Sequence, residues 1–199
     1  ILATGCISDK RPAKSGENRF MDRHMENVTQ LTFDGDNGEA YFSGDGKKLI
    51  FQSSRGGYAC DKIWTMNIDG KNSRMVSPNH GAHTCSYFFP DGKRIVFGSQ
   101  REGNFDVYVM NAHGTGVTRL TERMGYNGGP WFSPDGSKIV WRAWHPETDA
   151  EKAQWKDCME KNYITAVPLD LWVMDADGSD KRLLLKNGAT NWAPSWHPD

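Results

Sequence analysis

The sequence lacks the features of several protein classes. No apolar run approaches the roughly 20 residues that a transmembrane helix needs. There is no Gly-x-Ser-x-Gly, His-Glu-x-x-His or phosphate-binding-loop motif, and there are no cysteines paired at zinc-finger spacing. The 24 basic and 25 acidic residues give a net charge of −1, which offers no attraction for nucleic acid or an acidic membrane surface. We therefore expect no catalytic residues, no metal or other cofactor, and no nucleic-acid partner.

What the sequence does contain is a repeat. Each copy is an apolar run, an Asp-Gly pair and a second apolar run, as in Trp131-Phe-Ser-Pro-Asp-Gly-Ser-Lys-Ile-Val-Trp141. Earlier copies span Tyr41–Phe51 and Tyr87–Phe97, and Ser195–Asp199 begins a fourth. Asp-Gly favours the tight turns that join antiparallel strands, so each copy predicts a β-hairpin.

The period of the repeat predicts the architecture. Asp45 and Asp91 are 46 residues apart, and Asp91 and Asp135 are 44 residues apart. A repeat of that length with four short strands is typical of a β-propeller blade. The sequence therefore predicts an all-β propeller of four-stranded antiparallel blades.

We divide the chain into a leading region and a partial propeller. Residues 1–27 are expected to be the end of a signal segment and a polar tether, and residues 28–199 the partial propeller. Within it we expect a closing strand at 28–32, blades at 38–77, 84–121 and 130–185, an insertion at 144–168 in the third blade, and the start of a fourth blade at 191–199. Because propellers usually close with about four to eight blades, this open arc is expected to belong to a longer ring, unless two arcs close together.

The insertion is expected to be a short helix. Asp135 and Asp199 are 64 residues apart, which exceeds the period of the earlier blades. Thr148-Asp-Ala-Glu151 matches a capping box, and Trp155 begins an apolar stripe at helical spacing. We expect the helix to be ordered, to project from the face that carries the inter-blade loops, and to be removable without unfolding the blades.

Four sequence elements recur in a fixed order, and this order resembles a known repeat. Phe132–Val140 is followed by Leu171-Trp-Val-Met-Asp-Ala-Asp-Gly178, and Ser54-Arg-Gly-Gly57 and Gln100-Arg-Glu-Gly103 fill the middle position in the earlier copies. This order resembles the TolB-type propeller repeat family. The resemblance implies a ring of about six blades and a binding role in the bacterial cell envelope, although nothing matches the α/β domain that precedes the propeller in TolB itself. Related propellers stand in front of peptidase domains, so the alternative is an accessory propeller of a larger exported hydrolase.

The first residues indicate export. Ala3-Thr-Gly-Cys6 resembles the end of a bacterial lipobox, and a polar stretch follows it as a lipoprotein tether would. The alternative is a chance cysteine near the end of the sequence. We expect a periplasmic or outer-membrane-anchored lipoprotein whose membrane contact is through Cys6.

The chain has only four cysteines. Cys60 precedes the third strand of the first blade, and Cys85 opens the first strand of the second blade. These positions lie at the same end of a propeller, so a Cys60–Cys85 disulfide is predicted, as suits an exported protein. The alternative is two free thiols, and Cys158 is left over.

The two ends of the predicted blades differ. The Asp-Gly turns are short and uniform, whereas the opposite end carries varied inter-blade loops and the insertion, and variable loops on a rigid scaffold are where binding usually occurs. Candidate binding residues at that end are His80, His83, Tyr126, Trp144 and Trp155. The alternative for each is local packing, and the two histidines lack a third ligand for a metal. The expected partner is a protein, a peptide or a glycan.

Overall fold

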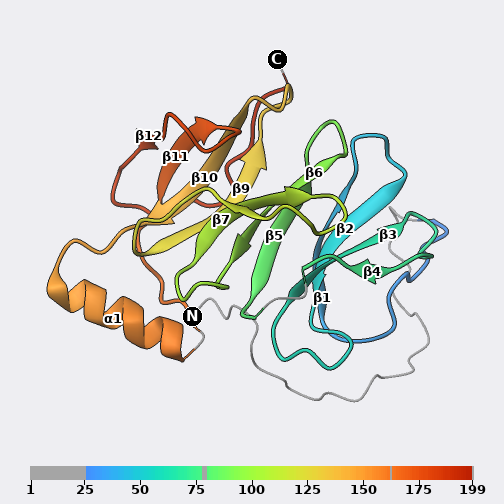
Figure 1. The fold of residues 1–199 in the computed structure, drawn as a ribbon, viewed down its shortest axis with the longest axis horizontal. Coiled ribbons are helices and arrows are strands. Elements are labelled where there is room, and N and C mark those ends of the chain that lie inside the picture. Colours follow the sequence, from blue (N-terminus) through green and yellow to red (C-terminus); the bar gives the residue numbers. More distant parts are fainter. Residues whose placement is uncertain (1–25, 78–79, 162, 199) are drawn as a thin grey trace.

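The chain forms three four-stranded antiparallel sheets and one helix in a computed structural model that describes residues 26–77, 80–161 and 163–198. Each sheet is made from one contiguous stretch of the chain. The sheets lie side by side in an open arc (Figure 1). The predicted all-β propeller fold, with one helical insertion, is therefore confirmed.

The strands of each sheet are paired in chain order. The first sheet consists of β1 (Asn37–Phe42), β2 (Lys48–Ser53), β3 (Lys62–Asn67) and β4 (Arg74–Met75). The second consists of β5 (His83–Phe88), β6 (Arg94–Ser99), β7 (Asp106–Asn111) and β8 (Thr118–Arg119). The third consists of β9 (Tyr126–Phe132), β10 (Lys138–Trp144), β11 (Asp170–Asp175) and β12 (Arg182–Leu185), and the helix α1 (Asp149–Glu160) lies between β10 and β11.

The Asp-Gly pairs form the predicted turns. Asp45 Oδ1 accepts hydrogen bonds from Ser43 Oγ at 2.6 Å and from the Lys47 amide at 3.1 Å. In the third sheet, Asp135 Oδ1 accepts from Ser133 Oγ at 2.5 Å. Hydrogen bonds favour the ionised carboxylate, and the pKa of Asp135 is lowered to about 2, with Ser133 as the largest cause. These aspartates therefore stabilise the backbone conformation of the turns.

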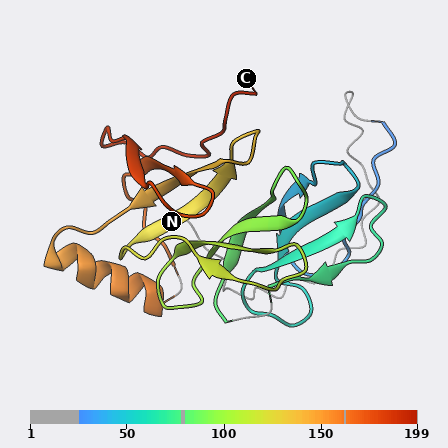
Figure 2. The same ribbon diagram turned by 45° about the horizontal axis from the view of Figure 1, so that its top comes forward.

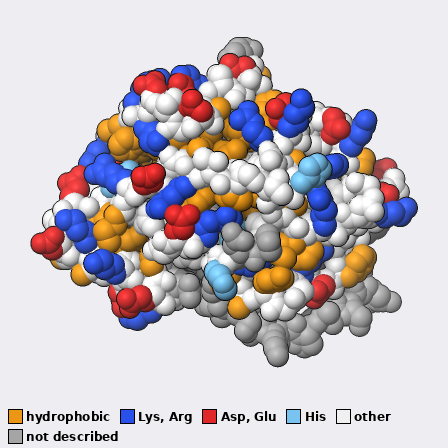
Figure 3. Space-filling model, in the orientation of Figure 1, with side chains coloured by type: hydrophobic (Ala, Val, Ile, Leu, Met, Phe, Trp, Pro, Cys, Tyr) orange, Lys and Arg blue, Asp and Glu red, His pale blue; other side chains and the backbone are white. Residues whose placement is uncertain are grey.

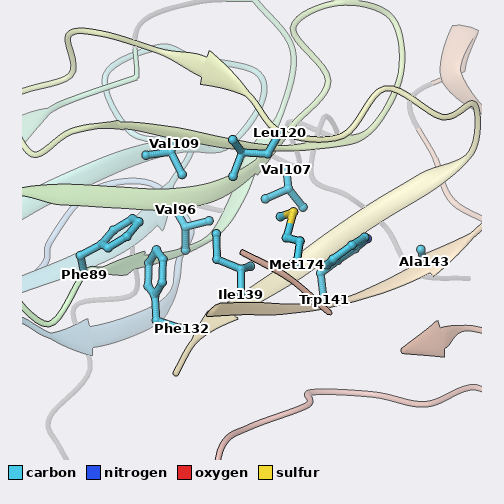
Figure 4. Packing of buried hydrophobic residues seen from close by; sticks show 10 residues of the cluster. All are labelled: Phe89, Val96, Val107, Val109, Leu120, Phe132, Ile139, Trp141, Ala143 and Met174. Carbon is cyan, nitrogen blue, oxygen red and sulfur yellow. The ribbon is translucent and has the colours of Figure 1, made fainter. Parts of the chain in front are cut away.

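The hydrophobic core lies between neighbouring sheets. One cluster joins the second sheet to the third (Figure 4), and its members are Phe89, Val96, Val107, Val109, Leu120, Phe132, Ile139, Trp141, Ala143 and Met174. A second cluster joins the first sheet to the second, and its members are Ile50, Ile63, Val76, Ile95, Phe97, Tyr108 and Met110. Figure 2 shows the sheets as separate, neighbouring blades. Each blade therefore buries its apolar side chains against the next blade.

The insertion forms the predicted helix and carries a core of its own. Thr148 caps α1, and a capping box with Glu151 is present. Trp155 and Cys158 are buried in one cluster with Phe105, which directly precedes β7, and Tyr126, the first residue of β9. This packing argues against the expectation that the insertion is removable without effect. No helix in the described part of the chain is long and apolar enough to cross a bilayer.

The segments that flank the sheets are irregular. Residues 28–32 are not part of any strand, and Leu31 packs beside Leu49 and Met66 of the first sheet. After β12, Trp196 Nε1 donates a hydrogen bond to the Trp131 carbonyl at 3.2 Å. The closing strand at 28–32 and the fourth blade from residue 191 thus stay predictions.

Candidate functional site

The first strand of each sheet carries the same backbone irregularity. The register of β1 against β2, and of β5 against β6, shifts within the first strand. The φ angle is 49° at Glu39, 51° at Cys85 and 56° at Gly129, which occupy equivalent positions in β1, β5 and β9. Ala193 repeats the feature with a φ of 50°. A positive φ is unfavourable for a residue with a side chain and persists only where the surroundings impose it.

A pocket of about 150 Å³ opens between the three sheets beside these bulges. Its polar wall includes Glu39, Gln52, Asp61, Tyr126 and Arg142. Its apolar wall comes from Ile164, Val167 and Leu169, where the chain leaves the insertion and enters β11. All three sheets and the insertion therefore contribute to a single pocket.

Arg142 is the central charged group of the pocket. It projects from β10, and only 5% of its surface is exposed. Its Nε donates a hydrogen bond to Tyr126 Oη at 3.2 Å, and its Nη2 lies 3.9 Å from Cys85 Sγ. The guanidinium carbon lies 3.5 Å from the centroid of the Trp192 ring, a cation–π contact. A side chain at Gly129 would place its Cβ 2.6 Å from Nη1, so the glycine makes room for the guanidinium.

On the acidic side of the pocket, Gln52 forms hydrogen bonds that connect Asp61 to β5. Its Nε2 donates to Asp61 Oδ2 at 3.0 Å, and its Oε1 accepts from the Cys85 amide at 3.0 Å. Burial raises the pKa of Asp61 to about 6, and the carboxylates of Asp36 and Glu39 raise it further. The pocket therefore holds a fixed positive charge on one side and a titratable carboxyl group on the other.

His80 and His83 lie outside this pocket. His80 is exposed. His83 is fully buried as the first residue of β5, where its Nε2 hydrogen-bonds the His80 carbonyl at 3.0 Å and its ring stacks on Phe97. No group of three or more His, Cys, Asp or Glu side chains in the described ranges is placed to hold a metal ion.

Among the three aromatic candidates, Tyr126 alone lines the pocket. It is the first residue of β9, whereas the sequence placed it in a loop before residue 130. Trp155 is buried, and its Nε1 donates to Asn104 Oδ1 at 2.9 Å. Trp144 is partly buried beside it, with ring centroids 6.0 Å apart. Both tryptophans hold the insertion against the blades.

The predicted Cys60–Cys85 disulfide is wrong, because Cys85 is a buried free thiol. The bulge turns its side chain into the pocket, towards Arg142. Burial raises the pKa of the Cys85 thiol to about 12, which favours the protonated thiol. Cys158 is also free and buried. Cys6, the predicted lipidation site, lies outside the described residues.

Sequence reasoning missed Arg142, Asp61, Gln52 and Trp192. A signal was present for two of them, because Gln52 and Arg142 occupy the same repeat position, seven residues after the turn aspartate, within otherwise apolar strands. The second blade has Gly98 at this position. A polar side chain at this position of an otherwise apolar strand therefore indicates a polar pocket between the blades.

A second hollow, of about 550 Å³, lies at the Asp-Gly end of the strands. It is bordered by Tyr41, Tyr87 and Trp131, whose rings meet at centroid distances of 4.2 and 4.3 Å along the row. None of the described residues that line it is charged. Because specific recognition needs a few placed polar groups, the pocket around Arg142 is the stronger candidate.

A family model described as TolB beta propeller domain matches residues 20–150. No functionally curated protein matches the chain. Among solved structures, the putative TolB from Agrobacterium tumefaciens is 22% identical with a TM-score of 0.61, over 78% of this chain and 51% of that one. TolB from Acinetobacter baumannii is 24% identical with a TM-score of 0.60, over 77% and 34%.

Propellers of hydrolases have the same fold. A structure from a study of two prolyl endopeptidases is 16% identical with a TM-score of 0.54, over 77% of this chain and 22% of that one. The chain thus spans about half of the length of the first of these proteins and about a third or less of the other two. At these identities the likeness concerns the fold.

Proposed function

Because the chain belongs to the TolB beta propeller domain family, we propose that it is a non-catalytic scaffold that binds a protein or peptide partner. The observation that carries this proposal is the pocket to which all three blades and the insertion contribute. It lies at the end of the strands that carries the varied loops, where binding is usual on rigid scaffolds.

The chemistry of the pocket favours a peptide over the other expected partners. A guanidinium and two carboxyl groups line it, and these form charge-assisted hydrogen bonds with charged groups such as those of a peptide. On the molecular face in Figure 3, basic and acidic side chains are interspersed with hydrophobic ones. Such a mixed surface suits a protein partner better than a nucleic acid, which attracts a basic patch.

A peptide array tests the binding role. The full-length protein is applied to random pentapeptides that are immobilised through their N-termini, with free C-termini in one set and amidated C-termini in the other. We expect a subset to bind, and Ala166→Trp, at the exposed rim of the pocket, to abolish that binding. Ala153→Trp, on an exposed position of α1, is the matched control. Retention of no peptide, or equal retention by the Ala166→Trp variant, contradicts the proposal.

The second candidate function is an accessory propeller of a hydrolase, which the match to the prolyl endopeptidase structure motivates. It requires a catalytic residue elsewhere in the full-length protein. A fluorophosphonate probe, which labels activated serines, distinguishes the two. A labelled serine outside residues 1–199 favours the hydrolase, and its absence in a protein that binds peptides favours the scaffold.

We also propose that the protein is exported to the bacterial envelope and anchored through a lipid on Cys6, on the basis of the lipobox-like Ala3–Cys6. The full-length protein is expected to incorporate labelled palmitate and to partition into detergent. Cys6→Ser should abolish both, and unchanged partitioning of that variant would refute the anchor.

A further inference from the structure

Arg142 places a buried positive charge in the pocket, and the carboxylate of Glu39, which also lines the pocket, acts on it electrostatically without forming an ion pair. Arg142 is 5% exposed, and it makes no ion pair with any residue in the described part of the chain. Its polar contacts there are the neutral Tyr126 hydroxyl and the Cys85 sulfur. Burying a charge that is not directly paired is unfavourable. The guanidinium therefore remains available to an anion that binds it directly.

Arg119 shows how the same chain treats an arginine with a structural role. Arg119 pairs with the fully buried Asp106 and with Glu102, whose carboxylate lies 3.0 Å from Nη1. Thr121 Oγ1 completes this network with a hydrogen bond of 2.7 Å to Asp106. Arg119 thus forms direct ion pairs within its blade, and Arg142 does not.

The surroundings of Arg142 fix its orientation. Trp192 covers one face of the guanidinium, Tyr126 takes the Nε hydrogen, and Gly129 leaves space beside Nη1. Nη1 makes no hydrogen bond to any described residue. A guanidinium held in this way presents a planar pair of donors, which matches the two oxygens of a carboxylate.

The volume of the pocket and its apolar wall limit the size and the polarity of the group that is attached to the bound anion. A cavity of about 150 Å³ holds a group about the size of benzene. Ile164, Val167 and Leu169 form the wall that such a group would contact. A carboxylate on a short apolar body fits, as in the last residue of a peptide or in an acidic side chain.

We propose that Arg142 binds a carboxylate of the peptide partner, with the attached aliphatic group against the apolar wall formed by Ile164, Val167 and Leu169. This inference rests on the proposed peptide-binding function and names the chemistry that the pocket recognises. The carboxylate comes from the C-terminus of the peptide or from an Asp or Glu side chain, and the experiment separates these sources.

The test is an NMR titration of the full chain, followed through the Nε–H signal of Arg142, which is assigned by its loss in Arg142→Met. Three probes are used: acetyl-Ala-Ala-Leu with a free carboxylate, the same peptide as its amide, and acetyl-Ala-Glu-Ala-amide. We expect the signal to shift with the first or the third probe, and not with the amide of the first. Equal responses to the acid and its amide, or no response to any probe, overturn the carboxylate site. The array result decides the peptide-binding function separately.

Variants test the role of Arg142 itself. Arg142→Met should weaken binding of the responding probe by about tenfold or more, because a charge-assisted pair is lost. Arg101→Met removes a half-buried arginine that stacks on Phe97 outside the pocket and should leave binding unchanged. Because an unpaired buried charge does not stabilise the fold, Arg142→Met should not lower the melting temperature. A lower melting temperature with unchanged binding would show a purely structural role.

A second variant covers the case in which Arg142→Met does not fold. Gly129→Ala places a methyl group 2.6 Å from Nη1 and should displace the guanidinium. Gly46→Ala is matched to it, because Gly46 also has a positive φ but has no atom within 4 Å of the added Cβ. Gly129→Ala should weaken probe binding while Gly46→Ala does not. Equal binding by both variants overturns the proposal.

Discussion

At the scale of single residues, the position of a side chain within the repeat explains its packing, which the amino-acid composition does not. Arg55, Arg101 and His145 each stand ten residues after a turn aspartate. The guanidinium carbons of Arg55 and Arg101 lie 4.9 and 5.3 Å from the ring centroids of Phe51 and Phe97. His145 takes this position where the insertion begins, and burial lowers its pKa to about 4, with two nearby cations adding to the effect. The same packing position thus holds a cation in two blades and a neutral ring in the third.

Asp61 gives the protein a predictable pH dependence. Its pKa is raised from 3.8 to about 6 in the folded state, so the folded chain binds this proton more tightly than the unfolded chain. The resulting stability is fully present below pH 3.8 and is lost as the pH rises through about 6. Asp61→Asn removes the ionisation, so it should raise the melting temperature at pH 7.5 and have a smaller effect at pH 4.5.

A turn aspartate provides the control of opposite sign. The pKa of Asp135 is lowered to about 2, so its carboxylate stabilises the fold above pH 3.8. Asp135→Asn should therefore lower the melting temperature at pH 7.5. Differential scanning fluorimetry across this pH range measures both variants. An Asp61→Asn effect that does not change with pH would contradict the assigned burial of Asp61.

At the scale of elements, the sequence predicts regular features and misses the bulges. The helix and its capping box follow from Thr148 and Glu151, because a cap is a local feature. Tyr126-Asn-Gly-Gly-Pro130 has the composition of a loop, yet it is the start of β9. A bulge accommodates a left-handed glycine at position 129 and a proline that has no amide hydrogen to pair. Such irregular strands cannot be told from loops by composition.

The insertion is predicted to stabilise the blades that it covers. Trp155 is buried against Phe105 and Tyr126, so Trp155→Ala leaves a cavity and should destabilise the protein by about 3–5 kcal/mol. Lys156→Ala, at an exposed position of the same helix, should change stability by less than about 0.5 kcal/mol. Urea unfolding curves give both values. A change below about 1 kcal/mol for Trp155→Ala would mean that the insertion is an appendage, as the sequence alone suggested.

At the scale of the whole molecule, the repeat was sufficient to predict the propeller, whereas the pocket was not predictable. The repeat fixes which strands pair, because each hairpin is local. The meeting of Asp61, Cys85 and Arg142 depends on how three blades pack around one another. The predicted disulfide failed for this reason: the two cysteines were placed at the correct end of the strands, but the bulge turns Cys85 inwards. Contacts between blades are not encoded in any single repeat.

The contiguity of each sheet has a consequence for how the chain acquires its structure. Every strand pairs with its neighbour in sequence, so loop-closure entropy is small within a blade and its hairpins form early. The two largest apolar clusters, however, lie between blades, so a blade completes the burial of these side chains only when its neighbour is present. We therefore expect folding to proceed along the chain with a delay of one blade, so that the sheet of residues 37–75 becomes fully stable only after residues 83–119 have been synthesised.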